Sequence, residues 1–249
     1  MTHDDLLAVF DIAAAAQRGA LATLSGTDRR ARTERPGQYR LDLVADAAVL
    51  PVLHAAGLRV LSEESGWSGP DDAEVTVVLD PVDGSTNCAR GIPYWAISLC
   101  AVDLDGPSCA LVQNGATGAR YSAVRGRGAE LDRTSISPAS TTLLERAVVA
   151  LSGLPPVPLA WRQFRALGSA ALALCDVAAG HLDGYLDGHA DQHAPWDYLG
   201  ALLVCREAGA VVADAEGREL VALDADTRRQ LVAAGTKDLV EQLHHGLGR

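Results

Sequence analysis

An apolar run that ends in two carboxylates is the first feature of the sequence suited to chemistry. In residues 77–87, VVLDPVDGSTN, Asp80 and Asp83 follow a strand-like stretch of valines and leucine. Carboxylates and backbone carbonyls are the oxygen ligands that Mg²⁺ and Ca²⁺ prefer. Pro81 restricts the turn between the two acids, so that the carbonyl of Val82 can face the same ion. The block therefore predicts a site for a divalent cation.

A Gly-Ser-Thr turn follows directly and is suited to an anion. Gly84 allows the backbone to approach a ligand closely. If a helix begins there, the amides of Gly84, Ser85 and Thr86 point at one place, which favours a phosphate group. An isolated block of this kind is also typical of a plain surface turn, so further ligands have to come from elsewhere in the chain.

Further acids lie beside apolar segments. LSEESG places Glu63 and Glu64 at the end of another predicted strand, and APWDYLGALLVCREAGA places Asp197 in the first turn of an apolar helix that Pro195 can start. Acids so close to apolar segments are easier to explain if one faces a cation. Each also has a plain alternative, because the glutamates can lie on a solvated loop and Asp197 can serve only the helix dipole.

The composition indicates a globular protein that binds neither nucleic acid nor membranes. The chain has 249 residues, 48% of them hydrophobic, and a formal charge of −11. This charge repels nucleic acid unless a local basic groove offsets it, whereas it suits a divalent cation. No apolar run reaches the roughly 18 residues of a membrane span. One basic segment is expected to be a mobile, solvated loop; it holds Arg29, Arg30, Arg32, Arg35 and Arg40.

The cysteines and the N-terminal segment favour a cytoplasmic location. The 5 cysteines show no CxxC spacing and their number is odd, so we expect neither a zinc site nor a complete disulfide framework. The N-terminal segment carries acids where a signal peptide would carry positive charge, and its pattern predicts an amphipathic helix. Small buried thiols in a reducing compartment are therefore expected.

Hydrophobic periodicity predicts two helices followed by an antiparallel meander. A helix is expected from about Asp4 to Leu24, a loop over residues 26–39, and a second helix over 41–56 that Gly57 can end. Apolar runs rich in β-formers, separated by Asp-Gly, Asn-Gly and Thr-Gly turns, then predict the meander. These runs are LRVLS, VTVVLD, YWAISLCAVDLDG, SCALVQNGATG and ARYSAVRGRGAEL.

From Thr141 onward, strands and helices alternate, which is typical of an α/β arrangement. The expected order is a short helix, the strand VVALSG, a helix over 168–179, the strand GYLDG, a helix over 195–208, the strands VVAD and LVAAG, and a final helix. No linker separates the halves. We therefore expect one layered α/β domain over residues 1–249, with subdomains at about 1–140 and about 141–249.

Four blocks carry a resemblance to a known family: SEES at 62–65, DPVDGSTN at 80–87, LGSAALALCDVAAGHLDGYLD at 167–187 and PWDYLGALLVCREAGA at 195–210. In their order and separations they closely resemble the inositol monophosphatase family of magnesium-dependent, lithium-sensitive phosphatases. The resemblance extends from the first helix to the last strand. It implies the αβαβα sandwich of inositol monophosphatases and fructose-1,6-bisphosphatases, and it suggests a homodimer.

The resemblance implies a metal site for two or three Mg²⁺ ions. Glu64 is expected to contact the metal ligands and not the ions themselves. These ions would bridge the phosphate oxygens, lower the pKa of a bound water and stabilise the leaving oxygen during in-line displacement. The implied ligands are Glu63, Asp80, the carbonyl of Val82, Asp83 and Asp197.

The resemblance also implies a pair of residues that activates the attacking water. Ser85 stands where the family usually has Thr, whose hydroxyl helps to hold this water. Asp46 matches the acid that partners the hydroxyl, and Asp42 is the nearby alternative. Together with Glu63, Asp46 and Ser85 form the implied catalytic set.

Substrate contacts follow from the same resemblance. Asp187 stands at the place of an acid that contacts hydroxyls of the alcohol, and Gly168 and Ser169 begin a helix whose amides can reach the substrate's rim. The segment 188–194, GHADQHA, is longer than in the animal enzymes. Its polar residues are interpreted as decoration of a loop, with substrate contact as the alternative; they are His189, Asp191 and His193.

The expected substrate is a small phosphate monoester, foremost inositol monophosphate or a related polyol or sugar phosphate. Alternatives within the family are histidinol phosphate, fructose 1,6-bisphosphate and 3'-phosphoadenosine phosphates. A monophosphate is favoured because a bisphosphate calls for a basic cluster opposite the metals, which the sequence does not locate. From a different class, a catalytically weak metal-binding regulatory module is suggested only by Ser85 in place of Thr.

Overall fold

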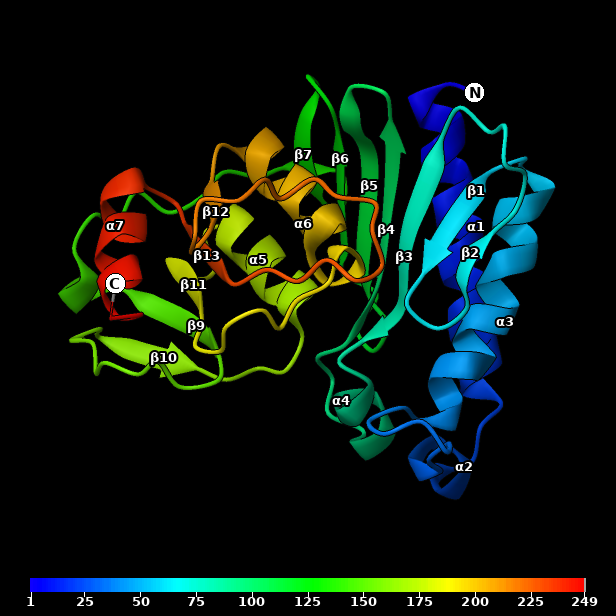
Figure 1. The fold of residues 1–249 in the computed structure, drawn as a ribbon, viewed down its shortest axis with the longest axis horizontal. Coiled ribbons are helices and arrows are strands. Elements are labelled where there is room, and N and C mark those ends of the chain that lie inside the picture. The colour runs from blue at the N-terminus through cyan, green and yellow to red at the C-terminus, as the bar shows by residue number, and fades with distance from the viewer. Residues whose placement is uncertain (249) are drawn as a thin grey trace.

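Two β-sheets alternate with helices in the order helix, sheet, helix, sheet, helix (Figure 1). The structure, a computed structural model, describes residues 1–248. Both faces of each sheet carry buried apolar side chains, so each sheet needs a helical layer on either side. This arrangement confirms the predicted αβαβα sandwich. Within the described residues, no helix is long and apolar enough to cross a bilayer.

The first sheet is 8-stranded, in the order β2-β1-β3-β4-β5-β6-β7-β8. Its neighbours are antiparallel except β1 and β3, which run parallel. The central strands are almost continuously buried, as expected of strands covered on both faces. The bounds are β1 Arg59–Ser62, β2 Gly66–Ser68, β3 Thr76–Asp83, β4 Ala96–Asp103, β5 Gly106–Asn114, β6 Arg120–Val124, β7 Gly128–Leu131 and β8 Thr134–Ser135.

Helices α1 (His3–Ala22) and α3 (Arg40–Ala55) cover the outer face of this sheet (Figure 1). Their apolar stripes meet the strands through side chains such as Phe10 and Val49, both fully buried. Thr2 caps α1: its hydroxyl accepts the amide of Asp5, and the Asp5 carboxylate accepts the amide of Thr2, which fixes where the helix begins.

Helices α5 (Ala170–Ala178) and α6 (Pro195–Ala208) lie between the two sheets (Figure 1). Nearly every side chain of both helices is buried, in agreement with a composition that is apolar all round. They share one hydrophobic cluster with strands of both sheets. The predicted site residues at the starts of α5 and α6 are therefore held by a rigid core.

The second sheet is 5-stranded, in the order β10-β9-β11-β13-β12, and helix α7 (Lys237–His245) covers its outer face. Strand β9 runs parallel to β10 and β11, whereas β13 is antiparallel to both of its neighbours. The bounds are β9 Val148–Ser152, β10 Gln163–Arg165, β11 Gly184–Asp187, β12 Val211–Asp214 and β13 Leu231–Ala234; a 3₁₀ turn, η1, spans Leu144–Arg146.

Several expected elements differ from those observed. The run LRVLS pairs parallel with β3 and not as part of an antiparallel meander, because the chain passes through β2 before it returns. Residues 26–39 are not a loop throughout: α2 (Gly26–Arg30) begins after its cap Ser25, and a β-bridge joins Arg32 to Tyr39. The sequence did not indicate β2 or β10, which are 3-residue edge strands. The subdomain boundary near residue 140 stays a prediction.

Candidate active site

Three acids far apart in the sequence meet at the edge of the first sheet. Glu63 follows β1, Asp80 lies in β3, and Asp197 lies in the first turn of α6. One carboxylate oxygen from each lies within 4.8 Å of the others. The parallel pairing of β1 with β3 brings Glu63 beside Asp80, and the start of α6 supplies the third acid. The structure thus brings these predicted ligands together.

The end of β3 contains an irregularity that changes the direction in which its acidic side chains point. Its register with β4 shifts between Asp80 and Asp83. In a regular strand these two positions would face opposite sides of the sheet, and a bulge re-aims the side chains. The turn is held by the amide of Val82, which donates to Asp80 Oδ1 at 2.8 Å. The carbonyl of Val82 accepts a bond from the hydroxyl of Ser85 at 2.9 Å.

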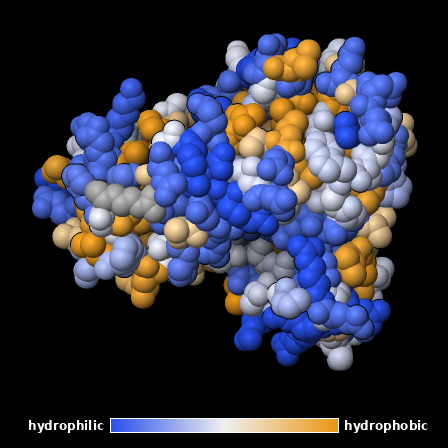
Figure 2. All heavy atoms as spheres, viewed as in Figure 1, coloured by the Kyte–Doolittle hydropathy of each residue, from blue (hydrophilic) through white to orange (hydrophobic). Residues whose placement is uncertain are grey.

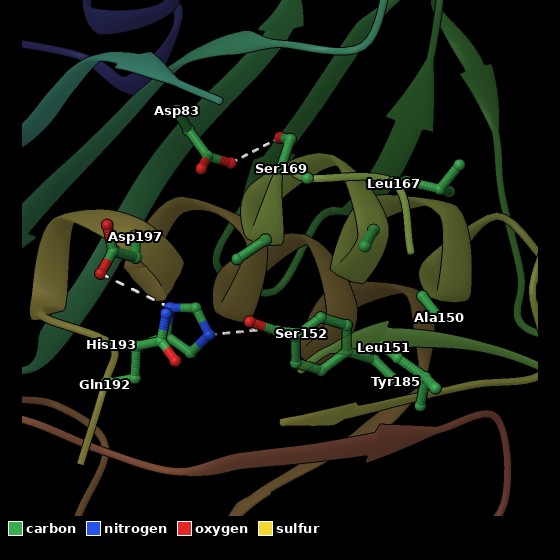
Figure 3. Close-up of a pocket in the computed structure, with 13 residues that line it drawn as sticks. Asp83, Ala150, Leu151, Ser152, Leu167, Ser169, Tyr185, Gln192, His193 and Asp197 are labelled. Carbon is green, nitrogen blue, oxygen red and sulfur yellow. Dashed lines mark hydrogen bonds and ion pairs between the residues drawn. The ribbon is translucent and has the colours of Figure 1, made fainter. Parts of the chain in front are cut away.

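Asp83 ties the strand end to α5. Its Oδ2 accepts the hydroxyl of Ser169 at 2.5 Å and the amide of Ala171 at 2.7 Å (Figure 3). Burial, together with the nearby Asp197 carboxylate, raises the pKa of Asp83 to about 6 despite these bonds. The side chain of Ser169 thus caps α5 and holds the Asp83 carboxylate. The sequence had indicated only that its backbone amide could reach the substrate.

The clustered carboxylates repel one another, and a bound cation would relieve this repulsion. Burial first, and then the neighbouring carboxylates, raise the pKa of Glu63 and of Asp80 well above the usual range. Among residues 1–248, no arginine or lysine forms an ion pair with any of the clustered acids. Carboxylates that no arginine or lysine compensates, and that offer hard oxygen donors, suit Mg²⁺, so the residues present fit the implied metal.

Asp42, and not Asp46, lies against Ser85. Burial raises the pKa of Asp42, and the hydroxyl of Ser85 is close enough to oppose this increase. Oδ2 of Asp42 accepts the amide of Tyr39 at 2.8 Å, whereas its Oδ1 is buried without a partner. Asp46 instead accepts the hydroxyl of Ser62 at 2.5 Å. The expected pairing of Asp46 with Ser85 is therefore corrected: one helical turn separates the two acids on α3, and the earlier one faces the site.

Two glycines let the halves of the chain meet at the site. Gly84 precedes helix α4 (Ser85–Arg90) and has a φ of 91°. A Cβ atom there would lie 2.9 Å from the carbonyl of Gly168, which itself has a φ of 84°. Only glycine combines this backbone conformation with so close an approach. The predicted phosphate-binding turn and the rim before α5 are therefore in direct contact.

A cavity of about 320 Å³ opens beside the acids. Its walls include Asp83, Ser169 and Asp197 on one side and Ser152, Tyr185 and His193 on the other (Figure 3). Figure 2 shows the molecular surface hollowed between the end that carries α4 and the end that carries β9 and β10. The cavity has room for the alcohol part of a small ester whose phosphate lies at the acids.

Asp187 does not line this cavity. Its side chain is fully buried, and its Oδ2 lies 3.4 Å from Nε2 of His193, which stands between the carboxylate and the cavity. The expected direct contact of Asp187 with a substrate hydroxyl is therefore corrected. Asp187 acts on the cavity wall through His193.

His193 is buried, so the interpretation of this residue as surface decoration of a loop is wrong. Its ring is buried, its Nε2 lies 2.8 Å from the Tyr185 hydroxyl, and its backbone pairs with Arg229 (Figure 3). Burial opposes protonation, but the Asp197 and Asp187 carboxylates outweigh it and raise the pKa of His193. The clue in the sequence is its spacing of 4 residues from Asp197. His189 and Asp191 are exposed.

The arginine segment is also ordered around side-chain contacts, which corrects the expected mobile loop. Arg35 lies 3.7 Å from Glu64, and Gln38 donates to the same carboxylate. Arg32 stacks on the ring of Tyr39 at 3.5 Å. The hydroxyl of Tyr39 in turn donates to Thr86 at 3.3 Å. The segment therefore packs against the turn that follows the predicted metal ligands Asp80 and Asp83.

Comparison with known proteins identifies the family of this chain. A model described as the inositol monophosphatase family matches residues 10–247. A fructose-1,6-bisphosphatase/inositol-1-monophosphatase of Methanothermobacter thermautotrophicus is 33% identical over 226 residues, which cover 82% of this chain and 80% of that protein. The Nus factor SuhB of Vibrio cholerae is 33% identical over 172 residues, which cover 64% of this chain and 63% of that protein.

Among solved structures, a hypothetical protein from Pyrococcus horikoshii with similarities to inositol-1 monophosphatase has the same fold. The TM-score is 0.88 at 24% sequence identity, and the match covers 98% of this chain and 99% of that one.

Proposed function

The chain belongs to the inositol monophosphatase family, a family of phosphoric monoester hydrolases, and we propose that it is a Mg²⁺-dependent phosphatase acting on a small polyol or sugar phosphate. Inositol monophosphate is the reference substrate. The observation that carries the proposal is the convergence of Glu63, Asp80 and Asp197 within 4.8 Å, beside a cavity of about 320 Å³.

The proposed ligands are the clustered acids together with the free oxygen of Asp83 and the carbonyl of Val82. Bound Mg²⁺, of which we propose two or three ions, would supply positive charge to the phosphate oxygens and would lower the pKa of a bound water. The chain's own contribution is to hold the ligands in place: the amide of Val82 fixes Asp80, and Ser169 and Ala171 fix Asp83. These bonds come from a strand end and a helix start, both on rigid elements.

Ser85 and Asp42 are proposed to orient the attacking water and to remove its proton. The hydroxyl of Ser85 lies next to Asp42, and Asp42 Oδ1 is a buried acceptor without a protein partner. A hydroxyl and a carboxylate side by side can hold one water with its lone pair free to attack. A general base of this kind typically contributes about 10²- to 10⁴-fold.

The alcohol part of the substrate is proposed to occupy the cavity beyond the acids. Ser152, Tyr185 and His193 offer polar atoms on its far wall, with Asp187 behind them. In this arrangement Ser152, Tyr185 and His193 contact the alcohol, and Asp187 does not. The two hydroxyls and the imidazole of this wall can form hydrogen bonds with the hydroxyl groups of a polyol or sugar.

Phosphate release from a panel of esters tests the function. The panel contains inositol 1-phosphate, histidinol phosphate, fructose 1,6-bisphosphate and 3'-phosphoadenosine 5'-phosphate, each with Mg²⁺ and with chelator. We expect turnover that chelator abolishes, and the best substrate names the alcohol. If no member turns over, the alternative of a catalytically weak metal-binding module replaces the enzyme.

We also propose a cytoplasmic homodimer without a nucleic-acid partner. The five free cysteines are all buried, which suits a reducing compartment, and the charge of −11 disfavours nucleic acid. Light scattering after size exclusion tests the dimer, with a mass near twice the 26.0 kDa of one chain expected.

A further inference from the structure

The segment 188–194 forms part of the wall of the cavity beside the acids. Two of its residues, Gln192 and His193, line this cavity and lie next to each other (Figure 3). His193 is buried, whereas Gln192 is exposed. A side chain that lines the cavity and is also open to solvent lies at the mouth of that cavity.

Gln192 is the one polar side chain of this cavity, among the described residues, that has no protein partner. The other polar side chains of the lining already bond to one another or to the backbone; they are Asp83, Ser152, Ser169, Tyr185, His193 and Asp197. A side-chain amide has two N–H donors and one carbonyl acceptor. All of these remain available on Gln192 for a bound molecule.

The backbone on either side of Gln192 is anchored. Gly188 donates its amide to the carbonyl of Ser152 at 2.8 Å, so the segment starts against the end of β9. Directly after Gln192, His193 exchanges two backbone hydrogen bonds with Arg229, at 3.1 and 2.8 Å. Because the segment is fixed at its start and near its end, the Gln192 side chain has a defined origin.

The residue before Gln192 is also held. Asp191 accepts a bond from Arg218 at 2.7 Å, and Arg218 is itself fixed by bonds of 2.8 and 2.9 Å to the buried carboxylate of Asp214. Asp191 has a φ of 51°, a left-handed conformation that is uncommon for residues other than glycine. Such conformations persist where the surroundings fix them, and they cluster at ligand-binding positions. Only the side chain of Gln192 therefore has to be ordered when a ligand binds.

The chemistry of this position suits an uncharged hydroxyl group. None of the described residues that line the cavity is an arginine or a lysine, and the amide of Gln192 carries no charge. A hydroxyl both donates and accepts a hydrogen bond, and one amide can serve either role. The matching ligand is the hydroxylated part of a neutral alcohol.

We propose that Gln192 determines the specificity of the site for the alcohol, by binding a hydroxyl of the substrate at the mouth of the cavity. The inference rests on the proposed phosphatase function and deepens it. It gives the segment 188–194 a contact with substrate through a residue that its pattern of acids and histidines does not single out. Gln192 takes no part in the chemistry at the phosphate, so it acts on the choice between alcohols and not on hydrolysis itself.

The test compares two esters that share a six-membered ring and differ in its hydroxyls, inositol 1-phosphate and cyclohexyl phosphate. Gln192→Met keeps the length of the side chain and removes its hydrogen-bonding groups. We expect the ratio of kcat/KM for inositol 1-phosphate to that for cyclohexyl phosphate to fall about 3- to 10-fold, the size of one hydrogen bond between neutral groups. Hydrolysis of cyclohexyl phosphate itself should stay unchanged. Gln163→Met, at an exposed glutamine on the edge strand β10, is the control and should leave the ratio as it is.

Three results would overturn the assignment and leave the phosphatase function standing. One is an unchanged ratio in Gln192→Met. Another is an equal fall for both esters in this variant, which would indicate a role in the fold or in the chemistry and not in specificity. The third is a wild type that releases phosphate from the panel of esters but does not favour inositol 1-phosphate over cyclohexyl phosphate. If the wild type hydrolyses neither ester nor any other of the panel, the proposed function itself fails.

Discussion

Nδ1 of His193 lies 3.6 Å from the carboxylate of Asp197, while Nε2 of the same ring lies 3.4 Å from Asp187. One buried imidazole therefore links a proposed metal ligand to a carboxylate that has no other ion-pair partner among the described residues. Oδ2 of Asp187 has no hydrogen-bond partner of its own, so its burial depends on this ring. The pair predicts strong energetic coupling between His193 and Asp187.

A double-mutant cycle measures that coupling. His193→Ala leaves the Asp187 charge buried and unpaired and should destabilise the fold, whereas Asp187→Asn removes the charge that needs the ring. We expect the two changes to be non-additive by about 1 to 3 kcal/mol in the free energy of unfolding, measured by urea denaturation. Additive effects would mean that the imidazole and the carboxylate do not interact.

The two acids of α3 should behave differently in catalysis. Asp42→Asn removes the carboxylate that faces Ser85 and should lower kcat about 10²- to 10⁴-fold, with Ser85→Ala lowering it as well. Asp46→Asn is the matched control one helical turn away, where the carboxylate accepts only the Ser62 hydroxyl, and kcat should change less than about tenfold. If Asp46→Asn proves the more damaging change in steady-state assays, the assignment of Asp42 is wrong.

The clustered acids should make the metal-free protein less stable as the pH rises. Burial and repulsion raise the pKa of Asp83 to about 6 in the folded state, against about 4 when unfolded. Folding therefore favours the protonated acid, and this stability is present below about pH 4 and lost as the pH rises through about 6. Between pH 4 and 6, the unfolding free energy of the metal-free protein should fall by about 2 kcal/mol.

Asp80→Asn removes one of the repelling charges and provides the comparison. Its metal-free form should show a flatter dependence on pH and should exceed the wild type in stability at pH 7. Equal slopes for the two proteins would show that the acids do not repel one another as their burial implies.

The effect of the close contact between Gly84 and Gly168 on stability can be separated from backbone strain. The comparison uses a second glycine that also has a positive φ but has no neighbouring atoms where a Cβ would lie. Gly84→Ala adds both left-handed strain and a Cβ 2.9 Å from the Gly168 carbonyl, whereas Gly126→Ala, with a φ of 74° and nothing within 4 Å, adds only strain. We expect about 1 to 3 kcal/mol for Gly126→Ala in thermal unfolding, and clearly more for Gly84→Ala. Equal losses would show that the turn can move away from α5.

The local patterns of the sequence predicted most elements that position the site. An apolar run rich in β-formers indicated β3, and helical runs indicated α5 and α6; α6 has the expected bounds, Pro195–Ala208. The parallel pairing of β1 with β3 could not be predicted in this way, because a hydrophobic run of 4 residues does not record the direction of its neighbour. That pairing is what brings Glu63 beside Asp80.

Contacts between segments distant in sequence account for the remaining differences. Asp42 and Asp46 both suit an amphipathic helix, and only the packing of α3 against α4 selects the one that faces Ser85. His193 is buried because its backbone pairs with Arg229, which is 36 residues further along the chain. Arg32 is ordered by stacking on an aromatic ring, which composition alone cannot indicate.

Phosphate release from inositol 1-phosphate as a function of Mg²⁺ concentration, for the wild type and Asp80→Asn side by side, tests the central claim most directly. The geometry predicts saturable turnover that chelator abolishes in the wild type, and less than a tenth of that rate in a folded Asp80→Asn variant. A variant that keeps more than a tenth of the rate, or a wild-type rate that chelator leaves unchanged, would contradict the assignment of Glu63, Asp80 and Asp197 as the metal site.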